Sequence, residues 1–382
     1  MTDRPLRLTL DVSAVPATPA GAGRYTLELA AALADRDDVD LTLVSRRADG
    51  ERWQTLADHH DGSRVLATAP TPRPLRLAWE QVALPGVLRR AGPDVHHGPH
   101  YTMPRRSPVP VVVTVHDCTF FDHPEWHERS KVAVFRRAIK QAARRADAVV
   151  CVSRTTAERL SELFPVSGPV VVAPHGVDHA RFGPEEPSPG ADADALVELG
   201  IDPDRPYVLH VGTLEPRKDV PGLVRAFDRV AAAHPDALLV IAGHRGWGAE
   251  DVARAVDSSA YRERMVRTGY VKDPAVPALL RRAAAVAYPS LEEGYGLPAL
   301  EALACGAPLV TTEGTAMAEL AGPAALLVPP GDPGALAGAL EVLLSGGGSA
   351  AAERRRLGLE VAAERTWAAS AERHMEAYRR SR

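Results

Sequence analysis

Two glutamates, Glu293 and Glu301, are separated by seven residues in the stretch EEGYGLPALEALACGAP. The turn Gly294–Tyr295–Gly296 lies between them, and a short apolar helix pattern begins at Leu297. One carboxylate can then reach a ligand at the glycine turn, while the other, further along the helix, accepts two hydroxyls such as those of a ribose. The spacing therefore predicts two groups that hold two ends of one molecule. The alternative is an ordinary amphipathic helix with Glu301 at its surface.

A second candidate site lies in GTLEPRKDV, which starts at Gly212 and stands between a buried strand pattern and a helix pattern. Arg217 and Lys218 are expected at the carboxyl end of the strand, beside the helix N-terminus. Two adjacent cations near free backbone N–H groups favour a dianion such as a diphosphate. The alternative is two solvated charges on a surface loop.

A glycine-containing turn, GAGRYTLEL, follows the first strand pattern. Gly21 and Gly23 let the backbone approach a ligand closely, and the helix N-terminus that carries Arg24 favours an anion. The third glycine of a dinucleotide fingerprint is missing. A tight structural turn is therefore the alternative to a phosphate or acceptor loop.

The motif TVHDCTF places His116 and Asp117 at the end of the apolar run 111–115. A histidine there can donate to a sugar hydroxyl or a phosphate. The alternative is a core histidine that donates to a backbone carbonyl. The nearby histidines match no helix-face metal pattern and have no carboxylate cluster beside them, so we expect no metal site; they are His96, His97 and His100.

The elements that must position these residues alternate between apolar strand patterns and helix patterns. Strands are predicted over residues 6–12, 40–45, 63–68, 94–98, 109–117, 147–153 and 169–178, and then over 207–213, 237–243, 265–271, 285–290, 308–312 and 324–329. Helices are predicted over 25–34, 79–91 and 129–146, and from near residues 220, 250, 274, 297, 317 and 333. This alternation indicates parallel sheets that are covered on both faces.

A change in composition divides the chain. Residues 181–195 are rich in Pro, Gly, Asp and Glu and lack periodicity, which is typical of a linker. We therefore predict an α/β protein with two doubly wound, Rossmann-like domains that face each other across a cleft. The predicted parts are an acceptor-side domain over 1–180, a linker over 181–198, a nucleotide-sugar-binding domain over 199–363 and a C-terminal helix over 364–382 that packs back on the first domain.

Composition limits the compartment and the partners. The chain has 382 residues, which suits two domains, and three cysteines whose spacing fits neither zinc nor a redox pair. With no secretion or membrane-spanning pattern, we expect a reduced, cytoplasmic protein. The net charge of −4 is too small for nucleic-acid binding, and heavy use of alanine and arginine is typical of a GC-rich bacterial genome.

One segment, residues 129–145, has seven basic residues and no acidic residue. Its apolar side chains recur at helical spacing, so we expect them to cover the sheet while the cations are solvated. Peripheral contact with an anionic membrane, at its cytoplasmic face, is the alternative.

Together these motifs resemble family 4 of the retaining glycosyltransferases, which have the GT-B fold. The Glu-seven-Glu stretch carries the strongest likeness, and VGTLEPRKD, GAGRY, TVHD and APHGVD follow the family's pattern in the expected order over nearly the whole chain. Two departures affect fine geometry only: Asp219 and His175 stand where many members have asparagine.

The resemblance implies a role for each candidate residue. Arg217 and Lys218 would stabilise the diphosphate leaving group, Glu301 would hold the ribose, and Glu293 with the backbone of 294–297 would hold the donor sugar. The remaining implied contacts are the base at the backbone of Val271, the donor sugar at His116, and the phosphate or acceptor at Gly21 and Gly23.

The implied activity is transfer of mannose or a related hexose, with retention, from a nucleotide sugar to a hydroxyl acceptor in glycan or glycoside biosynthesis. A GDP-sugar is favoured and a UDP-sugar is second; the acceptor is a glycan, a lipid-linked glycan or a small molecule. We expect no metal cofactor and assign no nucleophile. The alternatives are an epimerase or phosphorylase on the same architecture, a nicotinamide oxidoreductase, which the incomplete glycine fingerprint disfavours, and a binding subunit without activity.

Overall fold

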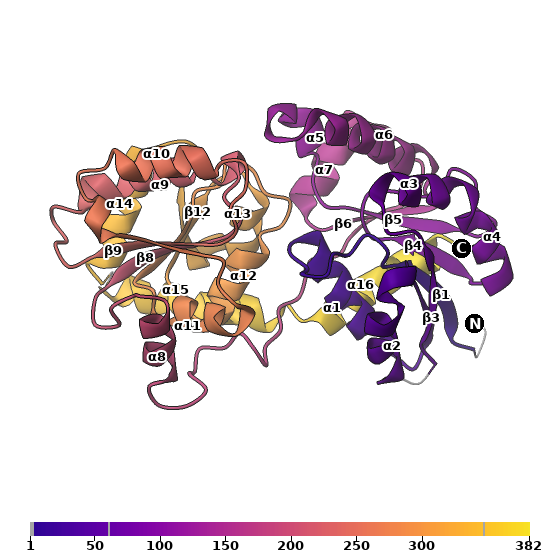
Figure 1. The fold of residues 1–382 in the computed structure, drawn as a ribbon, viewed down its shortest axis with the longest axis horizontal. Coiled ribbons are helices and arrows are strands. Elements are labelled where there is room, and N and C mark those ends of the chain that lie inside the picture. The colour runs from indigo at the N-terminus through magenta and orange to yellow at the C-terminus, as the bar shows by residue number, and fades with distance from the viewer. Residues whose placement is uncertain (1–3, 60–61, 347) are drawn as a thin grey trace. The chain divides into compact units, whose positions relative to one another are not determined.

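Strands and helices alternate along the chain and build two separate parallel sheets (Figure 1). The structure is a computed structural model that describes residues 4–59, 62–346 and 348–382. The chain divides into two units: Met1–Gly176 together with Trp367–Arg382, and Val177–Thr366. Each predicted strand overlaps one observed strand, so the predicted doubly wound α/β fold is confirmed.

The first unit contains a seven-stranded sheet in the order β3-β2-β1-β4-β5-β6-β7. All its pairs are parallel. The strands are β1 (Leu6–Asp11), β2 (Val39–Arg46), β3 (Arg64–Ala69), β4 (Val95–Gly98), β5 (Val111–Val115), β6 (Ala148–Cys151) and β7 (Val170–Val172).

Helices cover both faces of this sheet because its strands are apolar on both sides. In β5, Val112 belongs to one core cluster, whereas Val111, Val113 and Val115 belong to another. One face carries α1 (Ala22–Ala34), α2 (Gly50–Asp58) and α16 (Trp367–Arg380). The other carries α3 (Arg73–Val82), α4 (Leu84–Ala91), α5 (Thr119–Asp122), α6 (Arg129–Arg145) and α7 (Arg154–Leu163).

The second unit contains a six-stranded parallel sheet in the order β10-β9-β8-β11-β12-β13. The strands are β8 (Tyr207–Val211), β9 (Leu238–Ala242), β10 (Met265–Gly269), β11 (Ala285–Tyr288), β12 (Leu309–Thr312) and β13 (Ala325–Val328). One face packs against α9 (Val220–Val230), α10 (Ala249–Asp257) and α14 (Pro333–Leu344). The unit also contains α8 (Ala191–Glu198), α11 (Val276–Arg282), α12 (Leu297–Ala304), α13 (Ala316–Ala321) and α15 (Gly348–Ala363).

The single helix predicted over residues 79–91 is wrong, because two helices occupy this segment. α3 ends before Ala83 and α4 starts at Leu84. Pro85 explains the break, since proline has no N–H to donate and disfavours helical geometry in the residue before it.

The linker predicted over residues 181–198 is also partly wrong, because its last eight residues form α8. Asp192 of α8 accepts hydrogen bonds from Arg281 of α11, Nε to Oδ2 at 2.7 Å and Nη2 to Oδ1 at 2.6 Å, and both side chains are buried. Sequence periodicity missed this helix because Leu196 is its one buried apolar residue. The structure places the predicted linker in the second unit and Trp367–Arg382 in the first.

Helix α6 covers the sheet, as the preferred interpretation of its sequence predicted. Phe135, Ile139 and Ala142 are buried in a core cluster with β5 and β6. The apolar side of α6 is therefore occupied, and this helix alone is not an amphipathic membrane helix. Within the described part of the chain, no single helix has both the length and the apolar composition to cross a membrane, although the bent pair α14 and α15 passes that test together.

Candidate functional site

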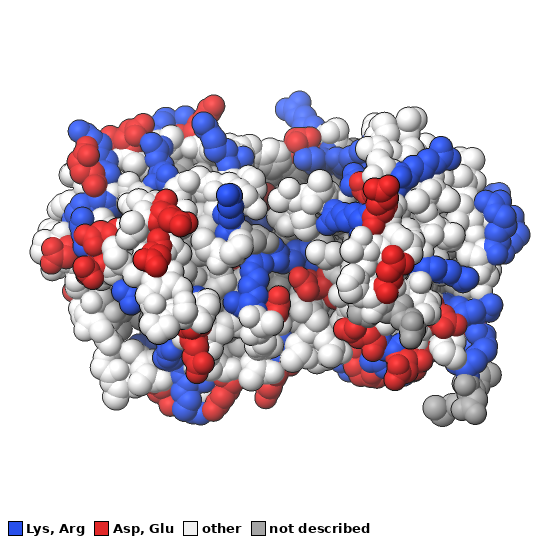
Figure 2. Space-filling model, turned by 60° about the horizontal axis from the view of Figure 1, so that its bottom comes forward, with Lys and Arg blue, Asp and Glu red and all other residues white. Residues whose placement is uncertain are grey.

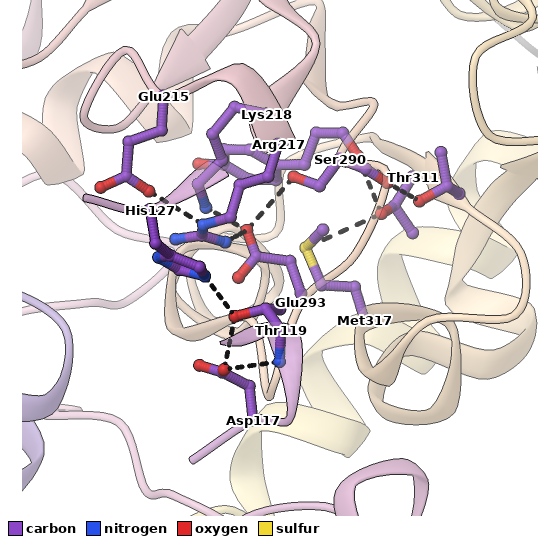
Figure 3. Close-up of polar contacts among 12 residues, drawn as sticks. Asp117, Thr119, His127, Glu215, Arg217, Lys218, Ser290, Glu293, Thr311 and Met317 are labelled. Carbon is purple, nitrogen blue, oxygen red and sulfur yellow. Dashed lines mark hydrogen bonds and ion pairs between the residues drawn. The ribbon is translucent and has the colours of Figure 1, made fainter. Parts of the chain in front are cut away.

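The two candidate motifs of the second unit meet at the carboxyl ends of neighbouring strands. Arg217 and Lys218 lie in the short 3-10 turn between β8 and α9. Glu293 lies in the loop between β11 and α12. Since β8 and β11 are adjacent parallel strands, their carboxyl ends bring the two loops together (Figure 3).

A single carboxylate oxygen links these residues. Glu293 Oε1 accepts from Lys218 Nζ, from Arg217 Nη1 at 2.6 Å and from Ser290 Oγ at 3.2 Å (Figure 3). Arg217 Nε also donates to Glu215 Oε2 at 2.8 Å. Glu293 is 8% exposed and Lys218 is 7% exposed, so this is a buried ion cluster.

The charges of the cluster depend on one another. Burial alone would raise the pKa of Glu293, but Arg217 and Lys218 outweigh it and lower that pKa to about 2. Burial lowers the pKa of Lys218, and the charge of Glu293 offsets part of that effect. Glu293 is therefore ionised at neutral pH, and its charge holds both cations at this edge of the sheet.

The glycine turn after Glu293 is packed tightly. Gly296 has φ +98°, and a Cβ there would overlap Met317 of α13. Tyr295 is buried. The Tyr295 ring is therefore packed inside the unit, and the contact of the 294–297 backbone with a donor sugar stays a prediction.

Glu301 is half-buried on α12. Burial is the main cause of the raised pKa of Tyr288, and the charges of Glu301 and Glu293 add to it. The charges at both ends of the Glu-seven-Glu motif therefore act on the same buried tyrosine.

Sequence reasoning missed His210 and Tyr288, which lie beneath the cluster. Their rings form an edge-to-face pair with centroids 5.5 Å apart. His210 Nδ1 donates to the carbonyl of Ala287 at 3.0 Å, whereas the buried His210 Nε2 and Tyr288 OH have no hydrogen-bond partner among the described residues. The available signal was a polar residue inside each of two apolar runs, YVLHV and AVAY.

The loops after β8, β9 and β10 are joined by backbone hydrogen bonds. Gly212 N donates to Ala242 O at 2.9 Å, and Gly243 N donates to Gly269 O at 2.7 Å. Gly243 has φ +143°, and a Cβ there would overlap the Gly212 carbonyl. The backbone at Gly212 is thereby fixed, and Val271, whose side chain is buried, follows in the loop after β10.

In the first unit, His116 directly follows the buried strand β5. Its Nε2 donates to the carbonyl of Pro99 at 2.8 Å, and its ring meets Tyr25 edge-on at 5.0 Å. The alternative interpretation of the sequence, a core histidine that donates to a backbone carbonyl, is therefore correct for the Nε2 atom of His116. In this tautomer Nδ1 is an acceptor, so His116 can accept from a hydroxyl but cannot donate from that nitrogen.

Asp117 has structural partners within the same unit. It accepts from Tyr101 OH at 2.8 Å, and from Thr119 N at 3.0 Å and Oγ1 at 2.6 Å (Figure 3). These bonds fix the turn after β5.

Gly21 and Gly23 lie at the start of α1, as predicted. Gly21 is exposed with φ +49°, and a Cβ there would meet nothing within 4 Å. Gly23 packs on the loop before it, since its Cβ would lie 3.2 Å from Pro16 Cδ. The space beside Gly21 is open, and Arg24 is half-buried in the first turn of α1.

A hydrogen-bond chain runs through the first unit and ends on α16. His374 Nδ1 donates to the Ser370 carbonyl at 2.7 Å, so in the neutral ring Nε2 accepts from Tyr25 OH, also at 2.7 Å. Tyr25 must then accept from Thr114 Oγ1 at 2.8 Å. Thr114 in turn accepts from His97 Nε2, and His97 Nδ1 accepts from Tyr378 OH, both at 2.8 Å. Each shared proton is therefore assigned to one donor atom, and both ring nitrogens of His97 form hydrogen bonds with hydroxyl groups.

Comparisons with known proteins agree with this architecture. Residues 19–181 match the family model described as Glycosyltransferase Family 4, and residues 193–359 match the one described as Glycosyl transferases group 1. The two matches cover most of the two units.

Similar proteins extend over most of the chain. The O-antigen chain mannosyltransferase B of Escherichia coli is 28% identical over 333 residues, which are 82% of this chain and 84% of the relative. The D-inositol 3-phosphate glycosyltransferase of Acidothermus cellulolyticus is 30% identical over 359 residues, which are 86% of this chain and 78% of the relative. Among solved structures, Anabaena HepE in complex with UDP and glucose superposes with a TM-score of 0.74 at 20% identity and covers 97% of this chain and 98% of that chain.

The paired parallel sheets, the motifs at their strand ends and these matches lead to one conclusion. The chain belongs to glycosyltransferase family 4 and has the GT-B fold.

Proposed function

We propose that the protein transfers mannose or a related hexose from a nucleoside diphosphate sugar to a hydroxyl acceptor, with retention of anomeric configuration. A GDP-sugar is the favoured donor, because a relative from Mycolicibacterium smegmatis that is 34% identical over 47% of this chain is named as a GDP-mannose-dependent mannosyltransferase. A UDP-sugar is second, because the similarly folded HepE was solved with UDP and glucose. The acceptor is a glycan, a lipid-linked glycan or a small glycoside precursor.

The observation that carries this proposal is the buried cluster of Arg217, Lys218 and Glu293. Glu293 Oε1 pairs with both cations, but its single charge cannot neutralise the two of them. A diphosphate carries more charge than one carboxylate and can engage both cations at once. We infer that the donor diphosphate displaces Glu293 from them.

Displacement of Glu293 by the diphosphate would have two effects on the reaction. As the bond from the anomeric carbon to phosphate breaks, negative charge grows on the diphosphate, and fixed cations in a buried site stabilise it. The released Glu293 carboxylate accepts hydrogen bonds from hydroxyls of the donor sugar. Glu301 accepts from the ribose, and the backbone of 294–297 lies under the sugar.

The cations also bear on metal dependence. Arg217 and Lys218 supply the positive charge at the leaving group that a divalent cation supplies in other transferases. We therefore propose metal-independent transfer. We assign no enzymic nucleophile, and His116 is proposed to accept from a donor-sugar hydroxyl through Nδ1.

A thermal-shift screen with GDP-mannose, GDP, UDP-glucose and UDP tests the donor class. A nucleotide at 100 times its Kd should add about 2.7 kcal/mol to the free energy of unfolding. The shift should be lost in Lys218→Gln, a change that keeps the side chain's approximate length and removes the charge. Equal shifts in the variant and the wild type would contradict the proposed diphosphate site.

Product analysis tests the reaction. We expect an α-linked product from an α-linked donor, assigned by the NMR coupling at the anomeric carbon. An epimerised donor formed without any acceptor would instead support an epimerase.

A further inference from the structure

We propose that His210 is a positioning residue that holds Lys218 against the donor diphosphate. Its Nε2 atom accepts a hydrogen bond from the Lys218 ammonium once the diphosphate has displaced Glu293. The inference rests on the proposed function, because the displacement of Glu293 is part of that proposal. All three residues belong to the second unit and lie near the carboxyl ends of β8 and β11.

The signal for this role comes from buried groups rather than from surface charge. Figure 2 shows acidic and basic side chains mixed over the face it presents, so charge of one sign does not single out a ligand site there. By contrast, His210 is 0% exposed and Tyr288 is 1% exposed, and among the described residues neither His210 Nε2 nor Tyr288 OH has a hydrogen-bond partner. Buried polar atoms are nearly always paired, so an unpaired one requires an explanation.

The surroundings of His210 assign a role to each of its ring nitrogens. Nδ1 lies 3.0 Å from the carbonyl oxygen of Ala287, which can only accept, so Nδ1 carries the proton. Burial, with a smaller contribution from the charge of Lys218, lowers the pKa of His210 to about 4, so the ring is neutral at neutral pH. Nε2 is therefore a hydrogen-bond acceptor.

Nε2 faces the loop that carries Lys218. A Cβ on Gly212, the residue directly after β8, would lie 3.6 Å from Nε2. The ring is held in this direction, because Nδ1 is bonded to β11 and Tyr288 packs edge-to-face with a centroid distance of 5.5 Å. The charges of Lys218 and Glu293 both act on the pKa of His210, so the ion cluster lies close to this ring.

Lys218 has donors that lack acceptors, which complements the unpaired acceptor of His210. Its ammonium has three N–H groups, and in the part of the chain that the structure describes it donates to one side chain, Glu293. Lys218 is 7% exposed, so water can satisfy little of the remainder. When a phosphate oxygen replaces Glu293, a second N–H still needs an acceptor, and His210 Nε2 is an acceptor without a donor.

The backbone on both sides of Lys218 is fixed, so its side chain is the part that must still be positioned. The carbonyl of Arg217 accepts from Leu291 N at 2.7 Å, which ties this loop to the loop after β11. Asp219 has φ +43° and caps α9 by accepting from Gly222 N at 3.0 Å. An acceptor at the ammonium completes this support, and a cation fixed in advance stabilises the departing diphosphate more effectively.

Two amide variants separate the two nitrogens of His210. In His210→Asn the amide reaches the place of Nδ1 and can still donate to Ala287, whereas in His210→Gln it reaches the place of Nε2. We expect His210→Asn to lower kcat by about 10- to 100-fold, the effect of losing one hydrogen bond to a charged group, and His210→Gln to stay within about threefold of wild type. Equal losses in the two variants, or a smaller loss in His210→Asn, would overturn the proposal.

Tyr207→Phe is the matched control for a loss of stability alone. Tyr207 is the first residue of β8, and its hydroxyl donates to the carbonyl of Leu279 at 2.7 Å. Losing this buried hydrogen bond should lower the melting temperature but leave kcat within about twofold of wild type. If kcat fell as far in Tyr207→Phe as in His210→Asn, strand stability would explain both losses and Nε2 would have no positioning role.

Nitrogen NMR of the full chain, with isotope-labelled histidine, provides a measurement that a change in stability does not affect. The His210 signals, assigned by their loss in His210→Gln, should show a protonated Nδ1, and addition of GDP or UDP should move the Nε2 resonance toward that of a hydrogen-bonded nitrogen. An unmoved Nε2 resonance, with a nucleotide that raises the melting temperature, would overturn this inference and leave the proposed function intact. If neither nucleotide nor its sugar conjugate raised the melting temperature of the wild type, the proposed diphosphate site would itself be contradicted, and this inference with it.

Discussion

Two connected networks of buried polar groups, one described above for each unit, differ in the charge of their members. In the first unit they are neutral: Tyr378, His97, Thr114, Tyr25 and His374 pass hydrogen bonds along one chain. In the second unit they are charged, since Arg217 and Lys218 both contact Glu293. In the neutral chain, each shared proton is already used in one hydrogen bond. The charged cluster ends on a carboxylate that a diphosphate can displace, so it is the better candidate for chemistry.

Mild acid should destabilise the first unit more than the second, and this difference in stability is the largest effect we expect. Burial lowers the pKa of six histidines in the first unit; they are His96, His97, His100, His116, His175 and His374, with values of about 4 for His96 and His374. Their unfolded pKa is about 6.5, so below that pH the unfolded state binds protons that the folded state does not. Each histidine then costs about 1.4 kcal/mol of stability per pH unit until its folded pKa is reached.

The second unit should stay folded over the same pH range. The Glu293 contribution is complete above the unfolded pKa of about 4.5 and is lost only as pH falls from there through about 2. In the second unit, burial lowers the pKa of His210 to about 4. Hydrogen exchange at stepwise lower pH should therefore show the first unit opening first, between pH 6.5 and 4. Simultaneous opening of both units would contradict the comparison.

The second largest effect should be a loss of turnover when one of the two cations is removed. Lys218→Ala or Arg217→Ala should reduce kcat by roughly 10²–10³, the effect of losing one group that stabilises developing charge. Arg225→Ala is the matched control, because Arg225 is largely exposed on α9 of the same unit. Steady-state rates at saturating donor decide this, and wild-type kcat in both cation variants would exclude a role in the chemical step.

Breaking the neutral chain should affect stability and not the donor site. Tyr25→Phe leaves His374 Nε2 without its donor and Thr114 without its acceptor, whereas Tyr378→Phe deprives only His97 Nδ1. An unsatisfied buried group costs about 1–3 kcal/mol, so Tyr25→Phe should destabilise by about that much more than Tyr378→Phe. Denaturant unfolding measures the difference. If the two variants have the same free energy of unfolding, the donors and acceptors along the hydrogen-bond chain are not assigned as we infer.

Chelation should produce the smallest effect. Since Arg217 and Lys218 supply charge at the leaving group, activity after exhaustive treatment with EDTA should stay within about twofold of the untreated rate. Restoration of a lost activity by magnesium or manganese would show that the two cations are insufficient.

The sequence predicted the strands well because buried parallel strands are continuous apolar runs. The run VVVTV, for example, is β5 almost without change. It predicted Arg217, Lys218 and Glu293 as separate donor contacts, but not their ion pairing. That pairing joins residues 75 positions apart and depends on the adjacency of β8 and β11, which local spacing does not encode.

Two other features could not be predicted from the sequence because they depend on contacts between residues far apart in it. The hydrogen-bond chain joins Tyr25 to His374, 349 positions away, and each residue alone has the pattern of an ordinary helix position. Helix α8 was missed because its stability comes from the ion pair of Asp192 with Arg281 rather than from an apolar stripe.

The placement of α16 has a consequence for how the protein is made. This helix contributes Ala371, Met375 and Tyr378 to the core of the first unit, yet it follows the whole second unit in the chain. The second unit, by contrast, is one continuous stretch of chain from Val177 to Thr366. During translation, the first unit must therefore wait with one face of its sheet incompletely covered while the whole second unit is synthesised.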